Sequence, residues 1–328
     1  MVDWTNILSL AAGQMLSPVT FAFALAALGL ALHFGFVGLL NFGLAGFMAV
    51  GAYAYAISSL TFGFPWWGAL LFSIVSSAVL AVLIGIPTLR LRGDYLAIVT
   101  IASAEVVRLL ITSVAFIDVT GSADGLTEYQ ASWRGANPLP DGSYGAGPWT
   151  YTANELWTLT FGVVAVIVCA LILWRLVHSP WGRVLKGIRE DEDAVRALGK
   201  NVFSYKMQAL MIGGVFAGLG GVVYVLPSST NPAVFLPSLT FFVWTALLLG
   251  GAATVFGPLL GAVIFWVLQA FVGALMPALV ESGILGFLTA EQASTARFII
   301  VGAGLILLIV FRPQGILGDK KELSFVSR

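Results

Sequence analysis

Few side chains in this sequence could support catalysis or bind a metal ion. Its one cysteine, Cys169, lies in an apolar run, and its two histidines, His33 and His178, are too far apart to share a metal. No G-x-S-x-G or H-E-x-x-H motif occurs, and no G-x-x-x-x-G-K-S/T loop is present to bind nucleotide phosphates. We therefore expect no catalytic residue, no metal and no cofactor, and we do not expect an enzyme.

Two opposite charges, by contrast, lie close together in an otherwise apolar segment. Glu105 and Arg108 are three residues apart, so on a helix both would project from one face. An isolated charge at the centre of a bilayer costs about 2.5–3.5 kcal/mol, and an opposite charge on the same face reduces that cost. The pair could line a path for a solute or form a structural contact with a neighbouring helix, and the sequence leaves both open.

Neutral polar residues in the same part of the chain could offer weak contacts to a passing solute. Together with the charged pair, these translocation-path candidates are Asn41, Tyr53, Thr100, Ser103, Glu105 and Arg108. No cluster of charges among the apolar segments could hold a zwitterion strongly, so we expect free solute to bind poorly.

The composition excludes a soluble fold. Hydrophobic residues make up 59% of the 328 positions and charged residues 10%, whereas soluble domains contain about 45–50% and about 25%. Residues 4–89 contain no charged side chain. The net charge is zero, and no basic surface is expected for nucleic acid. The sequence therefore indicates a polytopic protein embedded in a lipid bilayer.

Gly, Pro and the sparse charges divide the chain into nine apolar segments, most of them near the about 20 residues that a membrane helix needs. We predict them at residues 18–33, 36–60, 66–89, 95–117, 155–177, 206–226, 239–250, 257–280 and 295–311. Segment 239–250 is short and predicts a discontinuous or tilted helix. Residues 1–17 could form an interfacial helix or part of another span. The predicted fold is an all-α membrane helix bundle of about 8–10 transmembrane segments, with residues 1–328 as a single domain.

Positively charged residues predict the orientation, because they concentrate on the cytoplasmic side. With residues 178–205 in the cytoplasm, alternation of the spans places thirteen of the sixteen Lys and Arg inside and two outside. The N-terminus is then outside and the C-terminus inside. Residues 118–154 become an external loop, either a docking surface or a plain surface loop, and residues 312–328 become a cytoplasmic tail.

The cytoplasmic segment 178–205 predicts two short helices outside the membrane. Ser179-Pro180 is a helix start, because Ser caps and Pro is favoured in the first turn. Apolar residues at helical spacing then predict an amphipathic helix at the membrane interface. The acidic run 190–193 suits the start of a second helix, and Gly199 suits its end. A segment specified in this way favours docking to another protein over a plain connecting loop.

Four stretches resemble the branched-chain amino-acid ABC transporter permeases. The most specific is the run at 179–201, Ser-Pro-Trp-Gly-Arg-Val-Leu-Lys-Gly-Ile-Arg-Glu-Asp-Glu-Asp-Ala-Val-Arg-Ala-Leu-Gly-Lys-Asn, which resembles the coupling segment of that family. The other three are Gly38-Leu-Leu-Asn41-Phe-Gly43 through Gly51-Ala-Tyr53, Leu89-Arg-Leu-Arg-Gly93-Asp-Tyr95 through Glu105-Val-Val-Arg108, and Phe311-Arg-Pro-Gln-Gly315. The resemblance covers nearly the whole chain and is greatest to the M-type of the two permease subunits.

The resemblance implies a permease subunit that moves branched-chain amino acids inward across a bacterial cytoplasmic membrane. The partners it implies are a second related permease subunit, two cytoplasmic ATPase subunits and an external solute-binding protein. It also implies which residues couple to the ATPase, namely Arg189, Glu190, Asp191, Glu192, Asp193, Ala194, Val195, Leu198 and Gly199. Importer permeases often carry Glu-Ala-Ala-x-x-x-Gly here, whereas this chain has Asp193-Ala194-Val195-x-x-x-Gly199.

Two alternatives stay open at this point. Urea and amide permeases share the same motifs, so the solute is less well determined than the family. An ion-coupled secondary transporter is the other alternative. Proton coupling usually involves several intramembrane carboxylates, and the spans offer only Glu105, although a sodium site could use neutral oxygens.

Overall fold

The computed structural model describes residues 3–318 except residue 92, residues 284–288 and residues 312–313. Within that part the regular secondary structure is helical apart from one antiparallel hairpin. The helices of four or more residues and the two strands are α1 (Trp4–Met15), α2 (Pro18–Leu30), the π-helical turn η1 (Ala31–Phe36), α3 (Leu44–Thr61), α4 (Trp66–Thr88), α5 (Gly93–Thr112), α6 (Ile117–Thr120), α7 (Ala131–Gly135), β1 (Ser143–Ala146), β2 (Trp149–Thr152), α8 (Ala153–His178), α9 (Pro180–Glu190), α10 (Glu192–Ala197), α11 (Val202–Val225), the 3₁₀ helix η4 (Pro232–Phe235), α12 (Pro237–Gly250), α13 (Gly257–Glu281) and α14 (Ala290–Phe311).

Each of the nine predicted apolar segments contains a helix, which confirms the membrane helix bundle. Seven helices of the described chain are long and apolar enough to cross a membrane. Helix α12, at the predicted short segment, has only 14 residues. Helix α1 is a separate helix of 12 residues that packs against α13 and is too short to span a bilayer. The short β1–β2 hairpin within the predicted external loop was missed.

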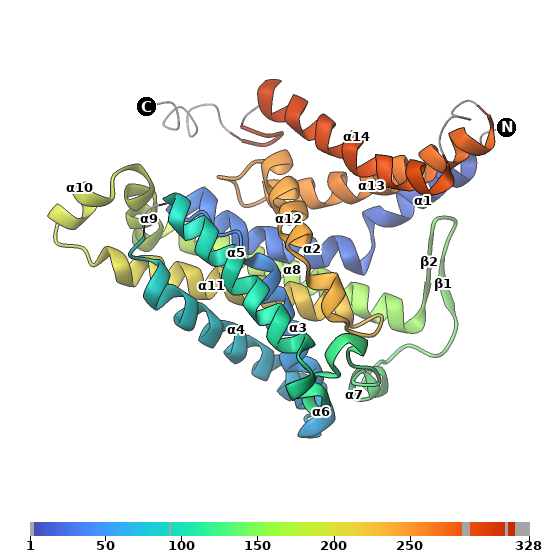
Figure 1. Ribbon diagram of the computed structural model, residues 1–328, viewed down its shortest axis with the longest axis horizontal. Helices are drawn as coiled ribbons and strands as arrows, with labels where there is room; N and C mark the ends of the chain where they lie inside the picture. Colours follow the sequence, from blue (N-terminus) through green and yellow to red (C-terminus); the bar gives the residue numbers. More distant parts are fainter. Residues whose placement is uncertain (1–2, 92, 284–288, 312–313, 319–328) are drawn as a thin grey trace.

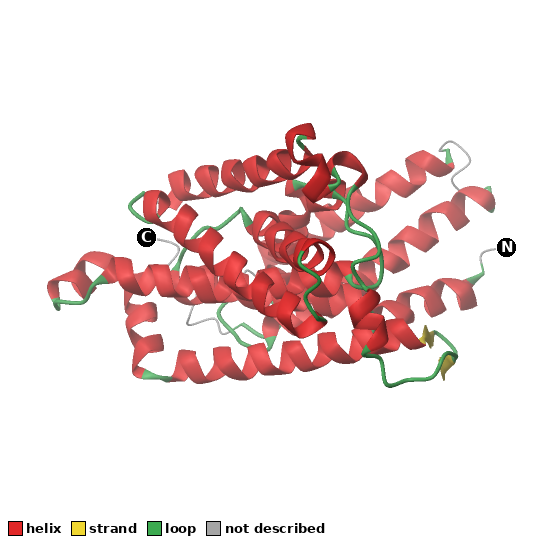
Figure 2. Ribbon diagram, turned by 90° about the horizontal axis from the view of Figure 1, so that it is seen from below, coloured by secondary structure: helices red, strands yellow, loops and turns green. Residues whose placement is uncertain are grey.

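The centre of the bundle is formed by α2, α3 and α11, whose glycines allow close contact between backbones. A Cβ atom on Gly51 would lie 2.3 Å from the carbonyl oxygen of Gly218, and one on Gly29 would lie 2.3 Å from that of Gly213. Small residues at such crossings let membrane helices approach closely. Helices α4, α5 and α8 pack around this centre and keep exposed apolar faces, which suits contact with lipid or with another subunit (Figures 1 and 2).

The two long polar loops of the sequence lie at opposite ends of the bundle. Helices α9 and α10 project at one end, and the β1–β2 hairpin lies at the other (Figure 1). The hairpin holds α1, because the Trp149 indole donates to the Ala12 carbonyl at 3.0 Å and the Tyr151 hydroxyl donates to the Leu16 carbonyl at 2.6 Å. Residues 118–154 and the start of the chain therefore share one end, as the predicted topology requires.

The loop at residues 118–154 is fastened to the bundle through a buried tyrosine. The Tyr129 hydroxyl lies 2.6 Å from the carbonyl oxygen of Val225 and 2.7 Å from that of Ser228, to which it donates. Burial raises the pKa of the Tyr129 hydroxyl, which keeps it protonated as a donor. Backbone bonds between Leu126 and Thr230 add a second attachment. The loop is thus an ordered cap and not a free connection.

Two predicted spans are longer than the helices they contain. The segment predicted at 36–60 is non-helical over residues 38–43 and becomes helical again only at Leu44, because Gly38 adopts a positive φ of 78°. The segment predicted at 95–117 leaves α5 at Thr112, because the next residue is extended and its hydroxyl caps a 3₁₀ turn. Of the predicted tail 312–328, only residues 314–318 are described. Arg92 also lies outside the described residues.

The α3–α11 crossing gives a first prediction. Replacing Gly51 with Val should destabilise the folded bundle by at least about 1–3 kcal/mol, because its Cβ would meet a backbone oxygen that cannot move aside. Thermal unfolding of the detergent-solubilised protein measures the effect. Gly302→Val on α14 is the matched control, since a Cβ there meets nothing within 4 Å. Equal melting temperatures for the two variants would contradict the prediction.

Candidate functional site

Local capping builds the α9–α10 segment as the sequence predicts. Ser179 caps α9, which begins with a proline. Asp191 ends α9 and caps α10 by accepting hydrogen bonds at 3.0 Å from the backbone N–H groups of Asp193 and Ala194. Gly199 follows α10 with a φ of 75°, which only glycine adopts without strain. The two predicted helices and their ends are confirmed.

The structure divides the nine coupling candidates into an outward and an inward group. The outward group is exposed and comprises Glu190, Asp191, Asp193, Ala194, Leu198 and Gly199. The inward group fastens the segment to the bundle. Val195 is buried, and the Glu192 carboxylate pairs with the Lys206 ammonium of α11. The Arg189 guanidinium donates to the carbonyl of Gly35 in η1.

Helix α10 presents a small exposed surface that we call the α10 surface: Asp193, Ala194, Ala197 and Leu198. The Leu198 side chain is 79% exposed, although it is apolar and lies outside the membrane helices. Arg196 bridges Glu192 and Asp193 at 2.9 and 2.7 Å, but exposed ion pairs of this kind contribute about 0–1 kcal/mol. The shape of this surface is therefore set by the caps on both sides of α10.

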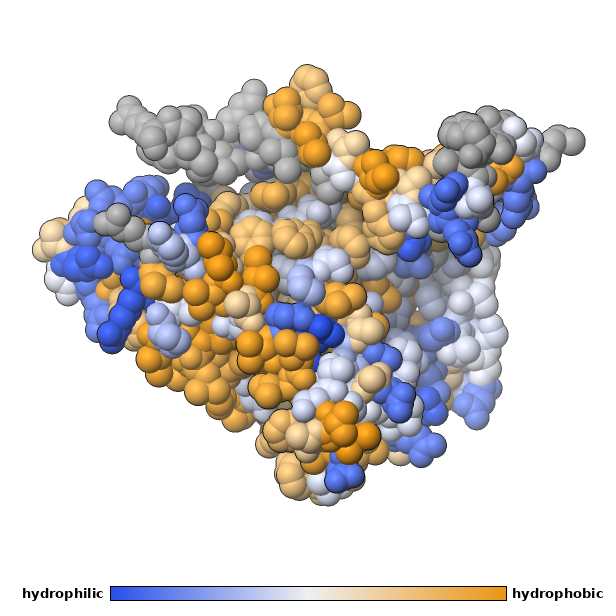
Figure 3. Space-filling view, viewed as in Figure 1, coloured by the Kyte–Doolittle hydropathy of each residue, from blue (hydrophilic) through white to orange (hydrophobic). Residues whose placement is uncertain are grey.

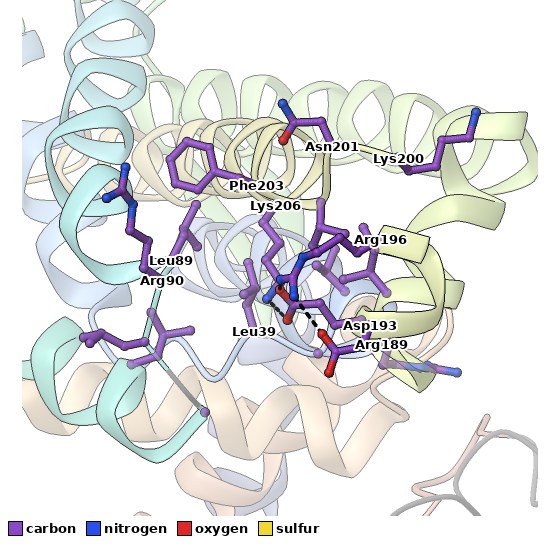
Figure 4. A pocket seen from close by; sticks show the side chains of 18 residues that line it. Leu39, Leu89, Arg90, Arg189, Asp193, Arg196, Lys200, Asn201, Phe203 and Lys206 are labelled. Atoms are coloured by element: carbon purple, nitrogen blue, oxygen red, sulfur yellow. Dashed lines mark hydrogen bonds and ion pairs between the residues drawn. The ribbon is translucent and has the colours of Figure 1, made fainter. Parts of the chain in front are cut away.

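A cavity of about 850 Å³ lies between α10 and the connection from α4 to α5. Most of the charged side chains in its wall are cationic, namely Arg90, Arg189, Arg196, Lys200 and Lys206 against Glu192 and Asp193. Figure 4 shows Arg90 and Phe203 on one side of the cavity and Arg196 with Asp193 on the other. The Arg90 guanidinium lies 5.9 Å from the centre of the Phe203 ring.

Three of the neutral path candidates are engaged with the protein backbone. The side-chain oxygen of Asn41 accepts from the Gly43 N–H at 2.8 Å, and the Thr100 hydroxyl accepts from the Phe42 N–H at 3.0 Å. Ser103 donates to a carbonyl of its own helix at 2.7 Å. These bonds satisfy polar groups that lipid could not, which favours a structural role for the three side chains.

The fourth neutral candidate, Tyr53, is buried at the centre of the bundle. Its ring is 2% exposed and packs edge to face against Phe235 of η4, with the ring centres 6.3 Å apart. This contact joins α3 to the segment that precedes α12.

Glu105 and Arg108 form the predicted ion pair on one face of α5. The Arg108 Nε lies 2.9 Å from Glu105 Oε2, and a second nitrogen of the guanidinium bonds the other carboxylate oxygen. Their side chains are 34% and 20% exposed. Hydrophilic atoms over α5 lie beside strongly hydrophobic surface in the space-filling view (Figure 3). The pair therefore lies on a face of α5 that another helix or a solute path would cover.

His33, which lies too far from His178 in the sequence to predict a shared metal site, is fully buried and takes part in a hydrogen-bond network. Its Nε2 lies 3.2 Å from the carbonyl oxygen of Leu210 on α11, and the Asn41 amide nitrogen lies 3.1 Å from its Nδ1. Both bonds are satisfied when the imidazole is neutral and carries its proton on Nε2. Burial of a polar ring inside an apolar span requires such partners, and the sequence does not show which distant residues supply them.

The family described as branched-chain amino acid transport system / permease component matches residues 15–310. The chain belongs to this permease family. It is similar to the permease LivM of Salmonella typhimurium, with 29% identity covering 92% of this chain and 69% of the relative. It is 26% identical to LivH of the same organism, covering 93% and 94% of the two chains. It is also 26% identical to the nucleoside ABC transporter permease NupC of Lactococcus lactis, covering 74% and 77%.

The permease also contains structural polar contacts on α12 that its sequence motifs did not predict. Thr240 of α12 accepts from the Ala45 N–H at 2.9 Å, and the Trp244 indole donates to the Asn41 carbonyl at 3.1 Å. Both residues lie in the short segment whose length was predicted but whose contacts were not. The one signal in the sequence was the position of polar residues within an apolar span, where each needs a partner.

The ion pair on α5 gives a second prediction. Replacing Arg108 alone with Met should lower the yield of folded permease, because the Glu105 carboxylate would lose its bidentate partner. The double variant Glu105→Gln, Arg108→Met removes both charges and should recover most of the yield. Fluorescence-detected size exclusion after detergent extraction compares the variants.

The outcome also distinguishes the two roles left open for this pair. A double variant that folds well and does not transport assigns the pair to the solute path. A double variant that folds as poorly as Arg108→Met contradicts the pairing as the source of the effect.

Proposed function

We propose that this permease is one membrane subunit of an ATP-driven importer that moves branched-chain amino acids into the cell. The observation that carries the proposal is the α10 surface, which is exposed on a capped helix at the end of the bundle opposite the external cap. A connecting loop without a partner needs neither two caps nor an exposed leucine at its tip.

The partner of α10 is an ATPase subunit. The sequence contains no phosphate-binding loop, so the energy for transport has to come from another chain. The six outward coupling candidates lie in or beside the α10 surface, while the three inward ones hold it to the bundle. A second permease subunit with its own coupling segment binds a second ATPase, so the assembly contains two permease subunits and two ATPase subunits. The two ATP sites of such an assembly need no residue from this chain.

The orientation follows from the charges together with the two ends of the bundle. The α9–α10 end carries the basic residues of the cavity, and placing it in the cytoplasm of a bacterial cell satisfies the positive-inside rule. The external cap and the start of the chain then face outward, and the C-terminus lies inside. The cap is the surface that we assign to a solute-binding protein.

The second permease subunit covers α5. In the helix window that would span the membrane, only 22% of α5 residues are buried, although the helix carries an ion pair. Lipid is a poor environment for that pair, whereas a related subunit such as a LivH-like chain would enclose it. The solute path then runs along this interface, with Glu105 and Arg108 beside it and Tyr53 behind it in α3.

The α10 surface gives a third prediction. Replacing Ala194 with Arg should abolish co-purification of the ATPase and ATP-dependent uptake, because a bulky charge would occupy a docking surface made of small side chains. The fold should survive, since Ala194 is exposed. Affinity purification of the assembly followed by quantification of each subunit measures the effect.

The control is the same substitution at the other end of the bundle. Ala131 of α7 is also exposed, so Ala131→Arg should leave the ATPase bound. If Ala194→Arg retains the ATPase and transports normally, the docking proposal is wrong.

The solute gives a fourth prediction. The neutral polar side chains near α5 are occupied by backbone groups, so the permease should bind free leucine only weakly, with a Kd in or above the micromolar range. Scintillation-proximity binding on the complex without solute-binding protein tests this. Sub-micromolar binding would place the recognition site inside the bundle instead.

Uptake into proteoliposomes separates the candidate solutes and energy sources. Labelled leucine, urea and a nucleoside are offered with the solute-binding protein, with ATP inside the vesicles or with an imposed ion gradient alone. Leucine uptake that requires ATP supports the proposal. Uptake of urea or nucleoside alone would reassign the solute, and uptake driven by the gradient alone would reassign the protein as a secondary transporter.

A further inference from the structure

The side chain of Arg189 joins the coupling segment to an irregular part of the membrane bundle. Arg189 lies in the last turn of α9, two residues before Asp191, the cap of α10. Its guanidinium donates to the carbonyl of Gly35 in the π-helical turn η1, 154 positions earlier in the chain. Its aliphatic stem lies along Gly38, where an added Cβ atom would be 3.1 Å from the Arg189 Cγ. Arg189 is thus held in place by η1 and not by the nearby carboxylates.

Helix α10 is attached firmly to the helix that carries Arg189. The Asp191 N–H between the two helices donates to the Gly187 carbonyl at 2.9 Å. Val195 of α10 packs against Gly187 of α9, where an added Cβ atom would lie 3.0 Å from the valine Cγ2. A displacement of α10 would therefore displace the end of α9, and with it Arg189.

On the other side of Arg189, residues 37–43 are bound to two further membrane helices. The Phe42 N–H donates to the Thr100 hydroxyl of α5 at 3.0 Å. The Trp244 indole of α12 donates to the Asn41 carbonyl at 3.1 Å. Because these residues form no helix of their own, side chains from α5 and α12 complete their hydrogen bonds.

Between α10 and the start of α5, the described residues line a cavity and not a packed interface. The cavity of about 850 Å³ separates Asp193 and Arg196 of α10 from Arg90, Leu91 and Gly93 at the start of α5 (Figure 4). A movement of α10 toward or away from the membrane can be absorbed there without displacing α5. The connection through Arg189 also borders this cavity, but each of its steps is a bond or a close packing contact.

We propose that Arg189 is a positioning residue for transport, which carries displacement of α10 into residues 37–43 and from there to α5 and α12. The proposal rests on the proposed function, in which the ATPase docks on the α10 surface. In this arrangement η1 is the point where a cytoplasmic movement enters the membrane. Helix α5, which carries the Glu105–Arg108 pair, is the element that receives it.

The test compares transport with ATP hydrolysis in the complete importer reconstituted in liposomes, with leucine and the solute-binding protein as the probe. Arg189→Ala removes the bond to Gly35 and should lower the leucine moved per ATP hydrolysed about tenfold, while ATPase binding and hydrolysis stay within about twofold. Arg189→Lys keeps one donor and should give an intermediate ratio. Arg183→Ala is the matched control, because Arg183 is an exposed arginine of the same helix.

A second pair of variants tests the other end of the connection. Thr100→Val removes the hydroxyl that accepts from Phe42 with little change in volume, and should also lower the leucine moved per ATP, whereas Thr100→Ser should restore it. Combining Arg189→Ala with Thr100→Val should add little to either, because both interrupt one connection.

The possible outcomes are distinct. A normal ratio of leucine to ATP in Arg189→Ala overturns the proposal. So does a parallel loss of hydrolysis and uptake with release of the ATPase, which would make Arg189 a docking or folding residue. If the unaltered importer retains no ATPase, the proposed function itself fails, and the inference fails with it.

Discussion

Inside a bilayer every backbone N–H and carbonyl group needs a partner from the protein, and this constraint explains the least regular part of the structure. The helix that begins at Pro18 passes into a π-helical turn and then leaves helical geometry over residues 38–43. Such a break is tolerable because Asn41 and Thr100 accept from backbone N–H groups within it, and Arg189 bonds the Gly35 carbonyl in the π-helical turn before it. The break and its supporting side chains form one unit.

The same constraint changes the interpretation of polar residues within the spans. In a transporter they suggest a solute path, because buried polar groups are costly. Here Asn41 bonds the backbone two residues along its own segment, while Thr100 and His33 bond backbone groups of other segments, so their cost is met by structural bonds. The pair of Glu105 and Arg108 differs, since it is only partly buried and lies on the poorly covered face of α5. Its partial exposure distinguishes this pair from Asn41, Thr100 and His33, which are buried.

The α9–α10 segment follows a different rule, because it lies outside the long apolar helices and can be specified locally. Its caps, its amphipathic face and the glycine that ends it are short-range features. The same segment nevertheless contains Arg189 and Glu192, whose partners lie on η1 and α11. A segment that is locally encoded and anchored at a distance is well suited to pass a movement between two proteins. Membership of the branched-chain amino acid permease family is consistent with that use.

The sequence by itself determined the membrane bundle, the positions of nine helical segments, the pairing of Glu105 with Arg108 and the helix ends at Ser179 and Gly199. These depend on hydropathy, on spacing within a few residues and on turn chemistry, which are properties of neighbours in the chain. Only the tertiary structure showed that residues 38–43 are non-helical, that His33 is a buried hydrogen-bonding residue and that Arg189 bonds the backbone of η1. Their partners are distant in sequence, and neither periodicity nor composition identifies which helix supplies the complementary donor or acceptor.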